Sequence, residues 1–413
     1  MKKPKKNYWE ERSRMSNIPK LRFPEFKGEW EEKRIDSIFD EKKEKNHPSE
    51  EVLTIIQGTG TVPRKASGRN IIFDEKSLSS YKFVQKDDFI IHLRSFEGGL
   101  EIANSNGIVS PAYIIMHPKL LIASKFYYSY FRSYKFINHV LPVSVEGVRD
   151  GRQIKYPILK EEKIPFTSFA EQQKIADFLS NVDSIITAET KILKTLQKKK
   201  KALMQKLFTQ QLRFKSDDGT DFPAWKEKKL GEIAIFSKGS GYSKSDLVSS
   251  GTPVILYGRL YTKYETVISD VDTFVQKKKN SVISVGNEII VPASGETAED
   301  ISRASVVKHN GIILGGDLNI IKVDLNHYIP EFIALCISNG EPKKRMAKLA
   351  QGKTIVHLHN SDLQQLIFSI PCKEEQQKIA DCLSSLDSLI QTQQKVVTTW
   401  QQRKKALLQQ MFV

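Results

Sequence analysis

The sequence contains few of the residues on which several classes of protein depend. Only three of its 413 residues are cysteines, Cys336, Cys372 and Cys382. They form no CxxC pair and leave an odd thiol, which argues against a disulfide framework or a zinc site and favours a reducing cytoplasm. No apolar run approaches the roughly 18 residues of a membrane span, and the basic first residues lack the apolar core of a signal peptide. The sequence therefore predicts a cytoplasmic globular protein that binds no metal.

Catalytic motifs are also missing. The stretch "QGKT" at residues 351–354 ends like a phosphate-binding loop, but Ala347 stands where that loop requires glycine. "IQGTG" at residues 56–60 lacks the third glycine and the following helix of a dinucleotide-binding loop, so we expect a plain turn. "HLH" at residues 357–359 has no further ligands nearby, and a surface pair is favoured. No Asn-Pro-Pro-Tyr tetrapeptide of an amino-methyltransferase occurs; the nearest is "SPAY" at residues 110–113. The chain is expected to have no catalytic site.

What the sequence does contain is positive charge and length. Lysine and arginine number 64 against 48 acidic residues, for a net charge of +16. A field of this sign favours polyanions such as nucleic acid, although an ordinary basic cytoplasmic protein would also carry it. A chain of 413 residues is too long for one core of ordinary size, so two or three domains are expected.

One heptapeptide, "EQQKIAD", occurs twice, at residues 171–177 and 375–381. The match extends without a gap from 171–208 to 375–412, and apolar residues alternate at spacings of 4 and 3, which is typical of a long helix with a coiled-coil seam. Both copies carry two polar interruptions, Glu189 with Gln393 and Lys200 with Lys404, which suggests a fixed register. Each helix of about 38 residues would be roughly 57 Å long. The expected seam residues are Ile175, Leu179, Val182, Ile186, Leu193, Leu196, Leu203, Leu207, Ile379, Leu383, Leu386, Ile390, Val397, Trp400, Leu407 and Met411.

A second similarity lies upstream and makes the whole chain a tandem repeat. "FPEFKGEWEEKRIDSIF" at residues 23–39 resembles "FPAWKEKKLGEIAIF" at residues 222–236. The dissimilar bodies that follow read as mixed α/β, with short apolar runs between glycine and polar turns. Expected strands are residues 52–56, 89–93, 113–116, 254–257, 288–291 and 318–323, and expected helices are residues 120–136 and 329–337.

These features together resemble the specificity subunit of type I restriction–modification systems. The motifs are the paired "EQQKI" helices, the "RFPEF…W" lead, "RSFEGG…GIVSPAY" in the first body and "SGETAEDI…GGD" in the second. The resemblance covers nearly the whole chain except about the first 17 residues. It implies an α+β protein with two target recognition domains in tandem, each followed by a long helix. The two helices would pair as an antiparallel coiled coil with pseudo-twofold symmetry.

The resemblance also implies a function and partners. Each target recognition domain would read one half of a split double-stranded DNA sequence. The chain would carry no catalytic site and no cofactor. It would recruit two S-adenosylmethionine-dependent adenine-N6 methyltransferase subunits, and two ATP- and Mg-dependent translocating endonuclease subunits could join them. On this basis the expected segments are a basic leader (1–17), a first recognition domain (18–168), a first spacer helix (169–211), a second recognition domain (212–371) and a second spacer helix (372–413).

Candidate DNA contacts are basic and polar residues in Gly-bearing or polar loops, because such side chains bind phosphates and base edges. Arg94 and Arg259 are favoured, since each follows an apolar strand into a turn. The glutamines of the repeated motif, Gln172, Gln173, Gln376 and Gln377, are candidate contacts to partner subunits if their faces are exposed. The candidate DNA contacts are Arg64, Lys65, Arg69, Arg94, Ser95, Arg149, Arg152, Lys238, Tyr242, Lys244, Arg259, Tyr261, Lys263, Ser294, Arg303 and Lys353.

Several alternatives stay open from the sequence. The lysine run at residues 197–206 could grip phosphates or could be the solvated face of a helix. A structural scaffold would explain the helices but would leave the two basic bodies without a purpose. Split-site type II enzymes use similar readers, so the type of system is not distinguished.

Overall fold

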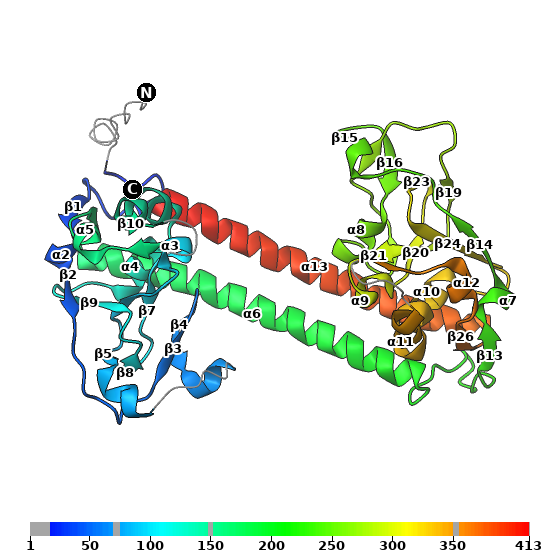
Figure 1. Cartoon of the computed structure of the whole chain (residues 1–413), viewed down its shortest axis with the longest axis horizontal. Coiled ribbons are helices and arrows are strands. Elements are labelled where there is room, and N and C mark those ends of the chain that lie inside the picture. Colours follow the sequence, from blue (N-terminus) through cyan, green and yellow to red (C-terminus); the bar gives the residue numbers. More distant parts are fainter. Residues whose placement is uncertain (1–16, 69–74, 148–151, 350–354, 413) are drawn as a thin grey trace. The chain divides into compact units, whose positions relative to one another are not determined.

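A computed structural model describes residues 17–68, 75–147, 152–349 and 355–412. Three of the predicted contact residues, Arg69, Arg149 and Lys353, lie outside these described residues, as does the "QGKT" stretch. The chain divides into two compact units, Met1–Thr190 with Lys395–Val413 (unit 1) and Lys191–Gln394 (unit 2). Both boundaries fall inside a long helix, α6 (Phe169–Phe208) or α13 (Lys373–Met411), so each unit contains a part of both helices (Figure 1).

Unit 1 is built around a four-stranded antiparallel sheet in the order β2-β9-β6-β7. Beside it lie the hairpin β3-β4 and the pairs β5-β8, β1-β12 and β10-β11. The strands are β1 (Glu31–Arg34), β2 (Phe39–Lys42), β3 (Leu53–Ile56), β4 (Gly60–Pro63), β5 (Lys82–Val84), β6 (Phe89–Ile91), β7 (Glu101–Ile102), β8 (Gly107–Val109), β9 (Ile114–Pro118), β10 (Val145–Glu146), β11 (Gln153–Ile154) and β12 (Lys163–Phe166). The short helices are α2 (Ile35–Ile38), η1 (Arg64–Ser67), η2 (Glu75–Ser80), α3 (Ser95–Gly98), α4 (Ser124–Tyr130), η3 (Phe136–Val140), η4 (Leu141–Ser144) and α5 (Tyr156–Leu159).

Unit 2 repeats this frame and enlarges it. Its main sheet has the order β14-β24-β20-β22-β17, and a second five-stranded sheet has the order β15-β18-β16-β23-β19. The strands are β13 (Lys226–Lys229), β14 (Ala234–Lys238), β15 (Leu247–Val248), β16 (Thr252–Ile255), β17 (Val267–Ile268), β18 (Phe274–Val275), β19 (Ile283–Val285), β20 (Glu288–Pro292), β21 (Ser294–Gly295), β22 (Ser305–Val307), β23 (Asn310–Leu314), β24 (Leu318–Val323), β25 (Val356–His357) and β26 (Ile367–Ile370). The helices are α7 (Leu230–Ile233), η6 (Lys244–Asp246), α8 (Tyr257–Thr262), α9 (Ala298–Ile301), α10 (Pro330–Ser338), α11 (Gly340–Leu349) and α12 (Asn360–Gln364).

The central strands explain why the sequence reads as short apolar runs. Every residue of β6 and of β20 is buried, because these strands have neighbours on both sides and packing on both faces. In unit 1 the aromatic helix α4 covers the sheet, with the Phe39 and Tyr127 rings 5.4 Å apart. In unit 2 α10 takes that place against β20 and β22, and all but its last residue are buried. The prediction of two α+β bodies on one frame is confirmed.

Several of the expected element boundaries differ from the observed ones, and in two places another element begins within the expected range. The helix expected over residues 120–136 is divided into α4 and the π-helical turn η3, since the chain turns after Tyr130 to bury Phe136 against it. The strand expected over 254–257 ends at Ile255, and Tyr257 already begins α8.

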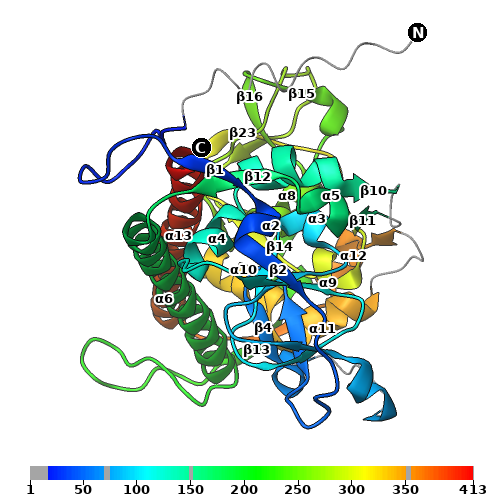
Figure 2. The same ribbon diagram turned by 90° about the vertical axis from the view of Figure 1, so that its left-hand side faces the viewer.

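The two long helices pack antiparallel within each unit. In unit 1 the start of α6 lies beside the end of α13 (Figure 2), and in unit 2 the end of α6 lies beside the start of α13. All sixteen expected seam residues are buried or half-buried. The two lysines of the seam are paired across it: Lys404 Nζ lies 2.5 Å from Asp183 in unit 1, and Lys200 pairs with Asp387 in unit 2. The two pairs occupy equivalent repeat positions, and a wrong register would separate them.

Phe412 provides a test of how the helix end joins the core of unit 1. Its ring packs against Phe126 and Tyr130 at centroid distances of 5.3 and 5.6 Å. Because it is buried, Phe412→Ala should lower the free energy of unfolding of unit 1 by about 3–5 kcal/mol. Phe208 holds the same repeat position in unit 2 but is only partly buried, so Phe208→Ala is the matched control and should cost less. Denaturant unfolding of the full chain, with hydrogen exchange to assign each loss to a unit, measures both. Equal losses would contradict this account.

Candidate functional site

The repeated motif begins with a buried carboxylate at the start of α6. Glu171 is only 1% exposed, and the Arg22 guanidinium binds both of its oxygens, with Nε and Nη2 at 2.7 and 2.9 Å. The Thr167 hydroxyl donates a third bond at 2.5 Å. Burial raises the pKa of the Glu171 carboxyl, but the bonds from Arg22 and Thr167 outweigh it and hold that pKa below its ordinary value. The bidentate pair therefore ties the first turn of the helix to the segment before β1 (residues 17–30, the lead segment of unit 1).

Unit 2 contains the same junction at the start of α13. Glu375 is fully buried, and Arg213 reaches its two oxygens through Nε at 3.1 Å and Nη2 at 2.6 Å. The Trp225 indole donates to the same carboxylate at 3.0 Å. Arg213 and Trp225 both lie in the segment before β13 (residues 212–225, the lead segment of unit 2), as Arg22 lies in the segment before β1.

The following glutamines correct one of our expectations. We considered Gln172 and Gln376 as exposed partner contacts, but they are 0% and 1% exposed. Each side-chain oxygen accepts a backbone N–H at 3.0 Å, from Ala123 and Ile329 respectively. Each amide nitrogen donates to carbonyl oxygens of its own unit, Thr167 for Gln172, and His327 and Pro371 for Gln376. Since all these bonds are internal, neither residue is available to another subunit.

The other residues of the heptapeptide make equivalent contacts in the two copies. The lysines pair with acidic residues of the lead segments, Lys174 with Glu25 and Lys378 with Asp217. The isoleucine and alanine of each copy are buried in the core. The exposed glutamines, Gln173 and Gln377, donate to the last motif residue at 2.9 and 2.7 Å. The motif thus encodes a junction that sets how each long helix leaves its domain.

The predicted DNA contacts of unit 1 lie on two elements. Arg94 precedes α3 and is 75% exposed, with Glu97 4.0 Å from it. Arg152 is exposed and its guanidinium lies 4.3 Å above the ring of Phe96, which α3 carries. The structure therefore brings Arg94 and Arg152 together around α3, although 58 residues separate them. Arg64 and Lys65 lie on η1, where Lys65 is exposed and Arg64 is half-buried beside Tyr81.

In unit 2 three predicted cations gather around Tyr264. The Arg259 guanidinium and the Lys263 ammonium lie 5.9 and 5.7 Å from its ring, and Arg303 Nη2 donates to its backbone oxygen at 3.3 Å. Lys263 and Arg259 also share the Asp272 carboxylate and lower its pKa to about 2. Because this single carboxylate faces two of the cations, the cluster remains positively charged near neutral pH.

Two of the remaining unit 2 candidates lie on other elements, and the third, Tyr261, lies on α8 with Arg259. Lys238 in β14 and Lys244 in η6 are exposed, and Tyr261 is half-buried.

Three polar candidates are buried, which corrects the expectation that they lie on exposed loops. The Ser95 hydroxyl accepts the backbone N–H of His92 at 2.9 Å and closes the turn before α3. Tyr242 packs in the second sheet of unit 2, and its hydroxyl accepts the N–H of Lys278 at 2.6 Å. Ser294 lies in β21, paired with β25. Local composition does not show which polar side chains turn inward, so the sequence does not distinguish a buried turn from an exposed loop.

One basic segment escaped the sequence analysis. Lys277, Lys278 and Lys279 follow β18 and are all exposed. Lys278 Nζ lies 2.7 Å from Asp246, and its neighbours extend from the same connection. The run of three consecutive lysines is the sequence feature from which this segment could have been predicted. They add positive charge to the second sheet of unit 2.

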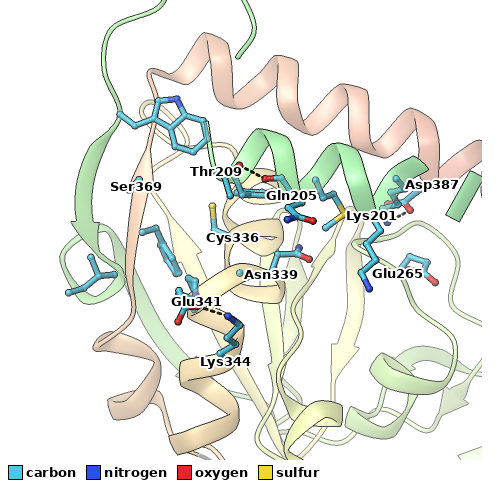
Figure 3. Close-up of a pocket in the computed structure, with 18 of the residues that line it drawn as sticks. Lys201, Gln205, Thr209, Glu265, Cys336, Asn339, Glu341, Lys344, Ser369 and Asp387 are labelled. Carbon is cyan, nitrogen blue, oxygen red and sulfur yellow. Dashed lines mark hydrogen bonds and ion pairs between the residues drawn. The ribbon is translucent and has the colours of Figure 1, made fainter. Parts of the chain in front are cut away.

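Unit 2 also contains a cleft of about 990 Å³ between α6, α13 and α11 (Figure 3). Met204, Phe208 and Trp225 supply apolar walls. Four of the charged residues that line it form two ion pairs, Lys200 with Asp387 and Lys344 with Glu341. Burial raises the pKa of the Cys336 thiol in its wall, which keeps the sulfur protonated and poorly nucleophilic. The geometry offers a binding surface and no activated nucleophile.

Motifs that sequence analysis set aside behave as expected where they are described. "IQGTG" forms the tight turn between β3 and β4, and the two histidines of "HLH" are exposed around the buried Leu358. Among the residues that the structure describes, no three His, Cys, Asp or Glu side chains gather in a way that could hold a metal ion. In the same part of the chain, no helix is both long and apolar enough to cross a membrane.

Two basic α+β units, each closed by the same junction onto a long helix, define a two-domain recognition protein. A family model for the type I restriction modification DNA specificity domain matches the chain twice, over residues 27–198 and 224–399. The chain therefore belongs to this family of type I restriction–modification specificity proteins. This confirms the expectation that the chain is a DNA-specificity subunit and not a catalytic subunit.

Curated relatives and solved structures agree with this assignment. The chain is 24% identical over 344 residues to the type I restriction enzyme MjaVIII specificity subunit of Methanocaldococcus jannaschii, covering 79% of this chain and 78% of that protein. It is 23% identical over 433 residues to the putative type I restriction enzyme MjaX specificity subunit of the same organism, covering 95% of both. The crystal structure of the S subunit of a type I restriction–modification system from M. genitalium matches with a TM-score of 0.59 at 18% identity, covering 96% and 99% of the two chains. That last likeness concerns the fold alone.

The buried carboxylate of unit 1 gives a pH-dependent test. Since the pKa of Glu171 is lower in the folded chain than in the unfolded chain, its stabilisation is present above the unfolded value of about 4.3 and is lost as pH falls through the folded value. Glu171→Gln should lower the free energy of unfolding by about 2 kcal/mol at neutral pH. The difference in free energy of unfolding between wild type and variant should become smaller below about pH 4. Denaturant titrations from pH 3 to 8 measure it.

The control for this test is Glu25→Gln, which removes an exposed ion pair of the same junction and should change stability little. A gap between wild type and Glu171→Gln that did not vary with pH would contradict the role assigned to the charge.

Proposed function

We propose that this chain reads a bipartite double-stranded DNA sequence, with one half-site contacted by each unit. The observation that carries the proposal is the repetition of one frame with two different basic surfaces. In unit 1 cations gather around α3, and in unit 2 they gather around Tyr264 and along residues 277–279. Because the frames match and the surfaces differ, the two half-sites should differ in sequence.

Exposed cations on short loops fit this function best. Arginine and lysine bind phosphates and also the O6 and N7 atoms of guanine, whereas buried side chains do neither without rearrangement. The residues that remain candidates for DNA contact are Arg64, Lys65, Arg94, Arg152, Lys238, Lys244, Arg259, Tyr261, Lys263 and Arg303.

The two long helices set the distance between the half-sites in this proposal. Both are continuous, with 40 and 39 residues, and both cross the boundary between the units. Successive major grooves on one face of B-DNA recur about every 34–36 Å, so two readers must be held at a defined spacing. The Lys–Asp pairs of the seam keep the register of the helices and so keep that spacing constant.

The catalytic work falls to partner subunits. We propose two adenine-N6 methyltransferase subunits, which bring S-adenosylmethionine, and two translocating endonuclease subunits, which bring ATP and Mg. The exposed Gln173 and Gln377 hold equivalent positions on the two junctions and are suited to contact two copies of one partner. Recruitment at two equivalent sites fits a chain that repeats its junction.

The first test expresses the chain with its methyltransferase subunit in a host that lacks adenine methylation. Long-read sequencing should then find N6-methyladenine in one motif made of two short defined parts around a gap of constant length. The methyltransferase subunit expressed alone is the control and should leave no such motif. A soluble complex without methylation would overturn the proposal and favour a structural scaffold.

The second test changes helix length. A heptad inserted in each helix, after Thr190 and after Gln394, keeps the seam periodic and adds about 10 Å of helix rise. The gap in the methylated motif should lengthen by roughly three base pairs while both half-sites stay the same. Two-residue insertions at the same places disrupt the seam and should abolish methylation. An unchanged gap after heptad insertion would refute the role of the helices as a spacer.

A further inference from the structure

The turn between β3 and β4, at residues 57–59, is held far more firmly than a hairpin of its size requires. The strands pair up to Ile56 and Gly60, and the Thr59 N–H donates to the Ile56 carbonyl at 2.9 Å. Gly58 and Gly60 have φ values of 84° and 89°, a region that favours glycine. The hairpin is therefore closed by hydrogen bonds of its own backbone.

A buried carboxylate from another strand makes four hydrogen bonds, two of them to this turn. Glu101 in β7 is fully buried and accepts the N–H groups of Gly58 and Gly60 at 2.7 and 2.9 Å. It also accepts the Tyr128 hydroxyl at 2.9 Å and Arg132 Nη1 at 2.8 Å. Burying a carboxylate is costly unless it is fully hydrogen-bonded, so this arrangement is specific to an organised turn. The turn is thereby fixed to the core of unit 1.

This turn presents two exposed side chains, Gln57 and Thr59. Gln57 lies against α3 so closely that a Cβ added to Gly98 would be 2.1 Å from its Nε2. Arg94 precedes the same helix, and Arg152 lies over Phe96 within it. An exposed amide therefore lies against the helix around which two exposed cations gather.

We propose that Gln57 reads an adenine in the first half-site through the major groove. Its amide oxygen would accept from adenine N6, its amide nitrogen would donate to N7, and Arg94 and Arg152 would bind neighbouring phosphates. Glu101 is the positioning residue that holds the turn. This inference rests on the proposed bipartite reading and adds the residue and the base.

The test compares the methylated motifs of variants in the same methyltransferase complex. Gln57→Ala should relax one adenine position of one half-site, with discrimination there falling about 10- to 100-fold, while the other half-site and the gap stay the same. Gln57→Glu should move the preference at that position toward cytosine, because a carboxylate accepts from cytosine N4. Gln85→Ala is the matched control, since Gln85 is an exposed glutamine on another turn of the same domain and should leave the motif unchanged.

Glu101→Gln separates positioning from general stability. It should relax the same base position as Gln57→Ala, with no change in the second half-site. A wild-type complex with a bipartite motif that Gln57→Ala leaves unaltered would overturn this inference alone. A wild-type complex that methylates no bipartite motif would overturn the proposed function and this inference together.

Discussion

The buried Glu–Arg pair at the start of each long helix is the interaction on which the rest of the structure depends. Glu171 with Arg22 and Glu375 with Arg213 each join the lead segment of a unit to its long helix, and the glutamine after each glutamate is bonded to the body. Because a buried carboxylate is destabilising without its partner, the start of the helix is stable only when the lead segment is in place. The direction in which the helix leaves the domain is therefore coupled to the folding of the domain itself.

The same logic of buried charge and paired register recurs along the chain. Lys404 with Asp183 and Lys200 with Asp387 align the helices at equivalent points of the repeat, and Glu101 organises the turn at Gln57. Polar groups in these places add little net stability compared with apolar packing, but they penalise alternative arrangements. In the function that we propose, which requires two surfaces at a constant spacing, defined geometry is worth more than additional stability.

Prediction from the sequence succeeded where the pattern was periodic or repeated and was wrong where only local composition was available. The heptads gave both long helices to within two residues at their starts and within one at their ends. Exposure could not be derived in the same way. Gln172 and Gln376 share the composition of the exposed Gln173 and Gln377 beside them, yet their side chains turn inward and are bonded to the body. Ser95 and Tyr242 were placed on exposed loops for the same reason and are buried.

The sequence by itself determined the tandem organisation, the helices and their seam, because each of these depends on spacing along the chain, and its motifs indicated the family. Only the tertiary structure decided which residues meet. Arg94 and Arg152 converge on α3 from positions 58 residues apart, and Glu101 reaches a turn more than 40 residues before it. Such contacts depend on the order of strands in a sheet and on which side chains desolvation forces into pairs. Neither of these leaves a periodic signal in the sequence.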